Sequence, residues 1–212
     1  MWIPPDALVS AIRELATRRA IDRGEVIHGI GAGSDGIYLI MSGRIRMVRM
    51  SPAGRPLMLT LLYPGSWFGD INTLLDLPRT DDAIADTVGV LLHIPKARFL
   101  ALLNARPDLQ MLVLKAMAGR LRLALEELEN SQLLTLSQRI ARRLLALHAA
   151  QCASSEADLP LPLTQQMVAD MVGVSRENAA RILGGWARKG YVSSRRGILT
   201  LSNLTALASI AT

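Results

Sequence analysis

Residues 163–201 read LTQQMVADMVGVSRENAARILGGWARKGYVSSRRGILTL, and two short helical patterns meet in them at Gly173. The apolar positions of the two patterns are, in order, Val168, Ala169 and Val172, and then Ala179, Ile182, Leu183 and Trp186. The second set recurs at i, i+3, i+4 and i+7, which is the spacing of one helix face. Gly173 supplies the positive φ that a tight turn between helices requires, and Ser175 is a favoured residue for capping the second helix. The stretch therefore predicts a helix-turn-helix.

The residues after Gly190 change from a helical period to a period of two. They read as two short strands joined at Arg195, Arg196 and Gly197, which predicts a β-hairpin with a basic tip and so a winged helix. Charged residues occupy the side of the second helix opposite its apolar stripe, namely Glu177, Arg181 and Arg188, and Arg176 stands in its first turn. These features favour contact with DNA over the two plainer alternatives, a solvated surface helix or a packing unit.

Positive charge is concentrated in the same part of the chain. Residues 131–212 carry 9 Lys and Arg against 4 Asp and Glu, whereas residues 1–130 carry 15 against 14, and the net charge of the whole chain is +6. Such an asymmetry is expected when one domain of a protein meets a phosphate backbone.

The composition excludes several classes of protein. The 212 residues are 50% hydrophobic, which suffices for a sizeable core, and no run of eighteen apolar residues predicts a membrane span. The N-terminus, MWIPPDALVSAIRELATRR, contains acids among its apolar residues and lacks the cleavage site of a signal peptide. The single cysteine, Cys152, excludes a disulfide within the chain and an all-cysteine iron–sulfur cluster. We therefore expect a cytoplasmic protein with no membrane partner.

Three segments are expected: residues 1–107, 108–134 and 135–212. The first begins with an amphipathic helix over residues 6–20 and continues from about residue 21 to 100 as short strands separated by glycine. Ile37–Met41 and Arg44–Met50 read as a hairpin. Many short strands at this spacing predict a β-sandwich or a β-barrel, and the spacing does not choose between them.

A long helix is expected over residues 108–131, because Pro107 ends the helical pattern that begins near Pro95. Its apolar residues recur alternately every three and four positions, at Leu114, Met117, Leu121, Ala124 and Leu128. Such a heptad seam predicts a two-stranded coiled coil and hence a homodimer. The alternative is one buried side of a helix that lies on the strand domain.

A further helix is expected over residues 133–150, with Leu133, Leu136, Ile140, Leu144 and Leu147 on its apolar side and Arg139, Arg142 and Arg143 outside. The polar connector QCASSEADLPLP follows it.

Three motifs together resemble the bacterial cyclic-AMP receptor protein / fumarate-nitrate regulator (Crp/Fnr) family of transcription factors. The most specific is GVSRENAARIL (Gly173–Leu183); the others are IYLIMSGRIRM (Ile37–Met47) and FGD with LPRT (Phe68–Asp70 and Leu77–Thr80). The resemblance implies an α+β chain with an N-terminal cyclic-nucleotide-binding-type β-barrel (a double-stranded β-helix, or jelly roll), a long dimerisation helix and a C-terminal winged helix-turn-helix.

The resemblance also implies roles for individual residues. Bases of a palindromic, TGTGA-like site would be read by Arg176, Glu177 and Arg181, with Glu177 orienting Arg181. DNA phosphates would be contacted by Ser175, Gln165, Arg188, Arg195 and Arg196. RNA polymerase is an expected partner, through a loop near residues 153–160.

The resemblance places an effector pocket at Gly69, Asp70, Arg79, Thr80, Leu121, Ala124 and Leu125. Cyclic AMP is disfavoured there, because Asp81 and Asp82 would repel its phosphate and because neither Ala124 nor Leu125 can hydrogen-bond a base. We expect Arg79 to pair with Asp70, Asp81 or Asp82 instead. Haem is not expected, since the histidines His28, His93 and His148 are scattered in the sequence. A small apolar ligand, or none, remains open.

Two other classes of function fit the sequence less well. A cupin-type enzyme would need two or three clustered histidines and a carboxylate, but residues 21–100 contain only His28 and His93, far apart in the sequence. The sequence also has no nucleophile–base constellation, no glycine-rich nucleotide loop and no Cys/His zinc spacing, so no enzyme is expected. A cyclic-nucleotide-binding module acting through protein contacts is the second alternative, and the winged helix argues against it.

Overall fold

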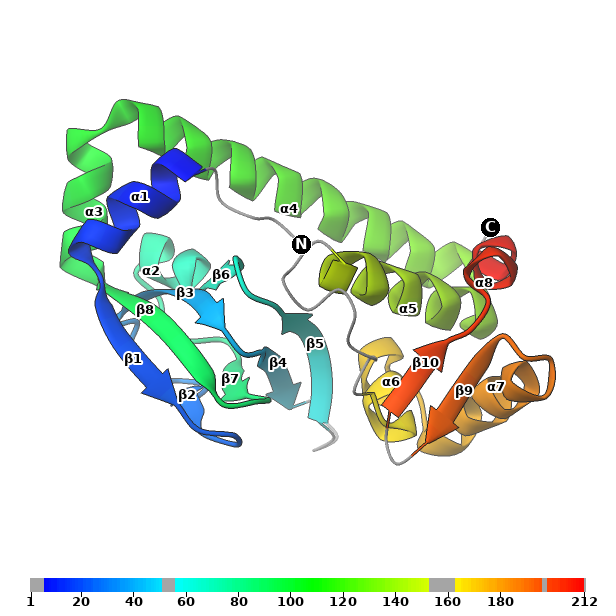
Figure 1. Cartoon of the computed structure of the whole chain (residues 1–212). Coiled ribbons are helices and arrows are strands. Elements are labelled where there is room, and N and C mark those ends of the chain that lie inside the picture. Colours follow the sequence, from blue (N-terminus) through cyan, green and yellow to red (C-terminus); the bar gives the residue numbers. More distant parts are fainter. Residues whose placement is uncertain (1–5, 51–55, 153–162, 196–197, 212) are drawn as a thin grey trace. The chain divides into compact units, whose positions relative to one another are not determined.

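The computed structural model describes residues 6–50, 56–152, 163–195 and 198–211, and it divides into two compact units, each considered by itself (Figure 1). The boundary between the units falls inside one long helix, at Leu125 and Glu126. None of the helices in these ranges is long and apolar enough to cross a membrane.

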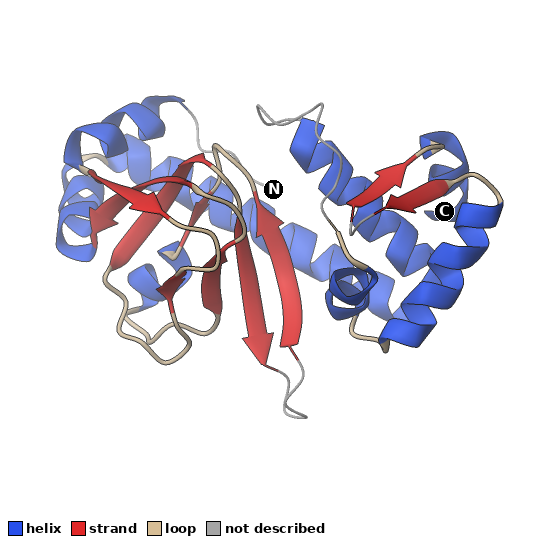
Figure 2. Ribbon diagram, turned by 60° about the horizontal axis from the view of Figure 1, so that its bottom comes forward, coloured by secondary structure: helices blue, strands red, loops and turns tan. Residues whose placement is uncertain are grey.

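The N-terminal unit is a sandwich of two four-stranded sheets (Figure 2). One sheet has the order β1 (Thr17–Ile21), β8 (Gly89–Pro95), β3 (Gly36–Ser42), β6 (Trp67–Phe68), and the other has the order β2 (Val26–His28), β7 (Asp82–Ala85), β4 (Ile45–Met50), β5 (Pro56–Leu62). The helices of this unit are α1 (Asp6–Leu15), α2 (Asp70–Leu75), α3 (Lys96–Ala105) and the first part of α4 (Pro107–Leu133). The two antiparallel sheets confirm the jelly roll, but they do not close into a barrel.

Strand β3 is apolar throughout because both of its faces are covered. Its residues Tyr38 and Ile40 pack in the cluster that also contains Ile45 of β4 and Ala83 of β7, in the opposite sheet. Its residues Ile37 and Leu39 pack in a second cluster with side chains of three helices: Ile12, Phe99, Leu103, Leu109, Val113 and Ala116. A continuous apolar run such as GIYLI is typical of a strand buried on both faces.

The predicted hairpin of Ile37–Met41 and Arg44–Met50 is wrong. Strand β3 pairs with β8 and β6, whereas β4 pairs with β7 in the other sheet. The chain passes from one sheet to the other at Gly43, whose φ is 82° and whose missing side chain makes room for the carbonyl oxygen of Val88. An alternating pattern shows which side chains face inward, but it does not show which strand is the partner.

The N-terminal helix is also shorter than predicted. It ends at Leu15, and residues 17–20 belong to β1, which pairs with β8. Helices α3 and α4 agree with the sequence, since Pro95 precedes the first and Pro107 begins the second.

The C-terminal unit contains α5 (Leu136–Cys152), α6 (Gln165–Val172), α7 (Arg176–Arg188), the hairpin β9 (Val192–Arg195) and β10 (Ile198–Leu201), and α8 (Leu204–Ala211). Helix α5 begins later than predicted, and Leu133 belongs to α4, where it is 81% exposed. Arg139 and Arg142, predicted outside, are half-buried and donate to the carbonyl oxygens of Val172 at 2.7 Å and Ala211 at 2.6 Å. They therefore tie α5 to the C-terminal ends of α6 and α8.

Candidate functional site

The two helices α6 and α7 are joined as the sequence predicts. Gly173 ends α6 with φ 71° and ψ 39°, and the amide of Val174 donates to the carbonyl of Ala169 at 3.0 Å. Ser175 caps α7, because its side-chain oxygen accepts from the amide of Asn178 at 3.3 Å. Thr164 caps α6 in the same way through the amide of Met167, a cap that the sequence analysis missed. Both helix N-termini are thereby fixed.

The apolar stripe of α7 is buried and its charged side is exposed. Ala179, Leu183 and Trp186 are buried, and Ile182 is half-buried. The exposed side carries four of the predicted DNA contacts: Arg176, Glu177, Arg181 and Arg188. Ser175 and Gln165, at the starts of α7 and α6, are partly exposed. The hairpin of β9 and β10 confirms the wing, with Arg195 exposed, whereas Arg196 lies outside the described residues.

The side chains at the start of α7 are ordered by local bonds. The carboxylate of Glu177 accepts hydrogen bonds from its own backbone amide and from the hydroxyl of Ser175. These bonds, together with the charge of Arg176, lower the pKa of Glu177. Glu177 is therefore ionised at neutral pH. The predicted orientation of Arg181 by Glu177 is not what the structure shows: Arg181 donates to the side-chain oxygen of Asn178 at 3.2 Å. Residues i and i+3 share a helix face, so Asn178 is well placed for this contact.

Helix α7 runs without interruption through Gly184 and Gly185. The nearest atoms that a side chain at either glycine would meet belong to Arg188, at 4.0 and 3.9 Å, so there is room for a methyl group. We expect Gly185→Ala to raise the free energy of unfolding by about 1 kcal/mol, because glycine is the poorer helix former. Urea denaturation measures this change.

The control for that variant is Gly173→Ala, whose added methyl group meets no neighbouring atom within 4 Å. Its φ of 71° lies in the left-handed region, so the same methyl group should lower stability by about 1–2 kcal/mol. Equal effects of the two substitutions would contradict this assignment of backbone conformation.

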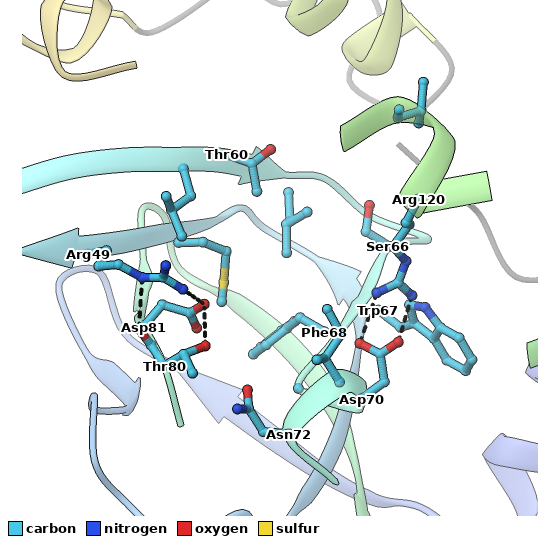
Figure 3. A pocket seen from close by; sticks show the side chains of 16 residues that line it. Arg49, Thr60, Ser66, Trp67, Phe68, Asp70, Asn72, Thr80, Asp81 and Arg120 are labelled. Atoms are coloured by element: carbon cyan, nitrogen blue, oxygen red, sulfur yellow. Dashed lines mark hydrogen bonds and ion pairs between the residues drawn. The ribbon is translucent and has the colours of Figure 1, made fainter. Parts of the chain in front are cut away.

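A pocket of about 540 Å³ lies in the N-terminal unit (Figure 3). Gly69, Asp70 and Thr80, three of the seven predicted effector residues, line it. Leu121, Ala124 and Leu125 are exposed and are not part of the lining, and α4 contributes Arg120 and Leu123 instead. Arg120 binds the carboxylate of Asp70 with both of its terminal nitrogens, at 3.0 and 2.7 Å. The heptad pattern missed Arg120 because it identifies apolar residues, not the side of the helix that faces the strands.

Arg79 has a different partner from the predicted Asp70, Asp81 or Asp82. Its side chain is fully buried and donates to the carboxylate of Asp35 at 2.7 Å and to the carbonyl oxygens of Gly36 and Gly69 at 2.6 and 2.7 Å. Asp35 lies in the loop before β3 and was not singled out by any motif. Arg79 therefore joins this loop to the start of α2 and does not line the pocket.

Two further side chains lie beside the carboxylate of Asp35. The hydroxyl of Tyr38 donates to it at 2.5 Å, and the Nε2 atom of His93 lies 3.3 Å away. Burial by itself would raise the pKa of Asp35, but the bonds from Tyr38 and Arg79 and the charges of His93 and Arg79 outweigh it and lower the pKa. Burial and the Asp35 carboxylate in turn raise the pKa of Tyr38.

Asp35→Asn should therefore reduce stability in a pH-dependent way. Since the pKa of Asp35 is lower in the folded than in the unfolded chain, its contribution is complete above about pH 4 and is lost as pH falls through the folded-state pKa. We expect the gap in melting temperature between wild type and Asp35→Asn to narrow below about pH 4. Melts from pH 7 to pH 3 measure it, with Asp22→Asn, at an exposed position, as control. A constant gap would contradict the role of this carboxylate.

The structure brings together two histidines that are far apart in the sequence. The rings of His28 and His93 both lie against Tyr38, with centroids 6.2 and 4.7 Å from it. They face different carboxylates, Asp81 at 3.6 Å and Asp35 at 3.3 Å. Among the residues that the structure describes, no group of three or more His, Cys, Asp and Glu side chains could hold a metal ion.

Comparisons with known proteins agree with this arrangement. Residues 18–106 match the cyclic nucleotide-binding domain, and residues 138–210 match the Crp-like helix-turn-helix domain. A CRP-like cAMP-activated global transcriptional regulator of Mycobacterium tuberculosis is 26% identical, over 97% of this chain and 92% of that protein. The cyclic AMP receptor protein of Thermus thermophilus is 29% identical, over 92% of this chain and 88% of that protein. A solved structure of a CRP/FNR-family transcriptional regulator, also from Thermus thermophilus, is 26% identical with a TM-score of 0.75, over 92% of this chain and 98% of that one.

Proposed function

The chain belongs to the Crp/Fnr family of transcription regulators, and from that premise we propose that it is a homodimer that reads an inverted-repeat, TGTGA-like site with α7. The observation that carries the proposal is that α7, which begins after the N-cap Ser175, exposes a polar side to solvent. A helix N-terminus and arginine side chains suit DNA, because both favour negative charge and because arginine pairs with guanine.

Three residues would enter the major groove: Arg176, Glu177 and Arg181. The arginines would donate to N7 and O6 of guanine, and Glu177 would accept from the amino group of cytosine. Asn178 would hold Arg181 in position through the bond described above. The residues proposed to contact phosphates are Ser175, Gln165, Arg188, Arg195 and Arg196.

The proposed dimer uses the exposed side of α4. Leu114, Leu121 and Leu128 are 60%, 61% and 57% exposed within one chain, and Ala124 is exposed between them. Met117 of the predicted seam is half-buried and packs partly on the core of the N-terminal unit. Seven-residue spacing of exposed leucines supports a two-stranded contact, and two copies of α7 would then address two half-sites.

Three further features complete the proposal. An effector bound in the pocket of the N-terminal unit would control DNA binding, RNA polymerase would be contacted at the promoter, and the protein would act in the cytoplasm. The relative from Mycobacterium tuberculosis and the solved structure from Thermus thermophilus named above are transcriptional regulators, and no catalytic activity is proposed.

Selection of binding sites from random DNA tests the proposal. We expect a two-fold symmetric motif whose half-site contains guanines at the positions addressed by Arg176 and Arg181. Enrichment of an asymmetric motif, or of none, would contradict it.

Cyclic AMP should bind weakly or not at all, although the two relatives carry it in their names. Arg79 is already engaged with Asp35 and two carbonyl oxygens, and the side chains of Ala124 and Leu125 offer no hydrogen bond to adenine. Isothermal titration calorimetry should show no binding in the micromolar range. Micromolar binding of cyclic AMP would contradict this expectation and restore cyclic AMP as the effector.

A further inference from the structure

The pocket in the N-terminal unit has charged side chains at its two ends and apolar walls between them (Figure 3). At one end the Nη2 atom of Arg49 lies 3.8 Å from Asp81, and its Nε atom donates to the carbonyl of Thr80 at 3.0 Å. At the other end Arg120 binds Asp70. The apolar walls come from Met47, Leu59, Leu62, Trp67, Phe68, Ile71 and Leu123.

Each cation of the lining thus has a carboxylate beside it in the same wall. An anionic ligand would have to compete with the carboxylate that already pairs with Arg49 or with Arg120. At Asp70, whose side chain is only 2% exposed, separating the pair would leave a buried charge without a partner, which is costly. A cationic ligand would likewise have to compete with an arginine that already pairs with Asp70 or Asp81. The charges of the lining balance within the pocket, so they favour an occupant without net charge.

Arg79 does not change this balance. Its side chain is fully buried, it is directed at Asp35 and the carbonyls of Gly36 and Gly69, and it is not part of the lining. The arginine that the sequence motif assigns to a ligand phosphate is therefore engaged in holding the fold together.

The apolar side chains of the lining also favour a ligand that is mainly apolar. Phe68 is buried and stacks on Tyr38 at 5.1 Å, while Arg120 lies over the ring of Trp67 at 5.6 Å, so both rings are held in fixed positions. A volume of about 540 Å³ lies in the range of sites that enclose small organic molecules. The lining also includes the polar residues Thr60, Ser66 and Thr80.

We infer that the pocket binds an uncharged, mainly apolar small molecule, with its body between Met47, Leu62 and Phe68. This inference rests on the proposed use of the pocket as the effector site. It names a class of ligand other than the cyclic nucleotides for which the matching domain is named.

Two fluorescent probes that differ mainly by one sulfonate test the inference: neutral N-phenyl-1-naphthylamine and anionic 8-anilinonaphthalene-1-sulfonate. The full-length protein should bind the neutral probe at least about tenfold more tightly than the sulfonate, and excess cyclic AMP should not displace it. Leu62→Trp, which fills the pocket, should weaken binding of the neutral probe at least about tenfold. The exposed Val88→Trp, in the same unit but outside the lining, is the control and should leave binding unchanged.

Three results would overturn the inference: no binding of the neutral probe, equal or tighter binding of the sulfonate, or displacement by cyclic AMP. Binding that Leu62→Trp leaves unchanged would also overturn it, because the probe would then lie elsewhere. Thr60→Trp, at a half-buried lining position, replaces Leu62→Trp if the latter fails to fold. DNA binding of the same preparations is measured in parallel; if it is intact while the probe results fail, only the ligand class is wrong and the proposed regulator stands.

Discussion

Leu121→Asp is expected to convert the protein into a monomer and to weaken its binding to a palindromic site at least about 100-fold. Leu121 is 61% exposed in the single chain, and it lies seven residues from both Leu114 and Leu128, which are similarly exposed. In the proposed dimer these leucines would meet their counterparts and be buried. Truncating a buried leucine costs about 2–5 kcal/mol, and the two facing carboxylates of the variant would in addition repel each other.

The loss of DNA binding follows from the loss of the dimer. Two α7 helices on one particle engage the second half-site at a high effective concentration, an advantage that a monomer lacks. Sedimentation velocity measures the assembly, and fluorescence anisotropy measures affinity for a full site and for a half-site. The full site should lose affinity strongly, whereas affinity for the half-site should be nearly unchanged.

Leu133→Asp is a matched control for this experiment. Leu133 is on the same helix and is 81% exposed, but it does not continue the seven-residue spacing of Leu114, Leu121 and Leu128. The control should remain a dimer with wild-type affinity. A Leu121→Asp protein that is still dimeric at micromolar concentration would show that the dimer, if present, uses another surface.

Arg176→Ala is expected to lose about 1–3 kcal/mol of affinity for the selected site and to relax the preference at one base position of each half-site. The reason is geometric. Arg176 is exposed in the first turn of α7 beside Glu177, and Glu177 is one turn from Arg181, so the three side chains can reach one major groove. Site selection with wild type and variant, followed by anisotropy on single-base variants of the site, measures both effects.

Arg195→Ala separates base reading from phosphate contact. Arg195 ends strand β9 and is exposed, and a phosphate contact there carries no sequence information. The variant should weaken binding to all sequences alike and reduce the slope of log affinity against log salt by about 1. If Arg176→Ala behaved in this uniform way as well, its proposed role as a base reader would be wrong.

The helix-turn-helix could be predicted from the sequence because its determinants are local. The Ser175 cap bonds an amide three residues away, Gly173 needs only its own backbone freedom, and the stripe from Ala179 to Trp186 repeats within two turns. Such interactions join residues that are close in the sequence, so the pattern of residue types along the chain is enough to recognise them.

The local sequence pattern did not identify the partner of the Arg181 side chain within that motif. Glu177, Asn178 and Arg181 are all polar residues of one helix side, and the sequence suggested the charged pair. Asn178 and Glu177 lie three and four residues before Arg181, so both are its neighbours on the helix surface. The structure pairs Arg181 with Asn178, while Glu177 is bonded by its own amide and by Ser175.

What the sequence by itself determined, then, is the set of elements: the winged helix-turn-helix, the long helix with its exposed leucines and a domain of short strands. Only the tertiary structure decided their pairing and the lining of the pocket. Arg79 bonds Asp35 across 44 positions and Arg120 bonds Asp70 across 50. The physical reason is that such contacts depend on which strand lies beside which and on how α4 is rotated about its axis. An alternating or heptad pattern is compatible with several partners, and packing of the whole domain selects one.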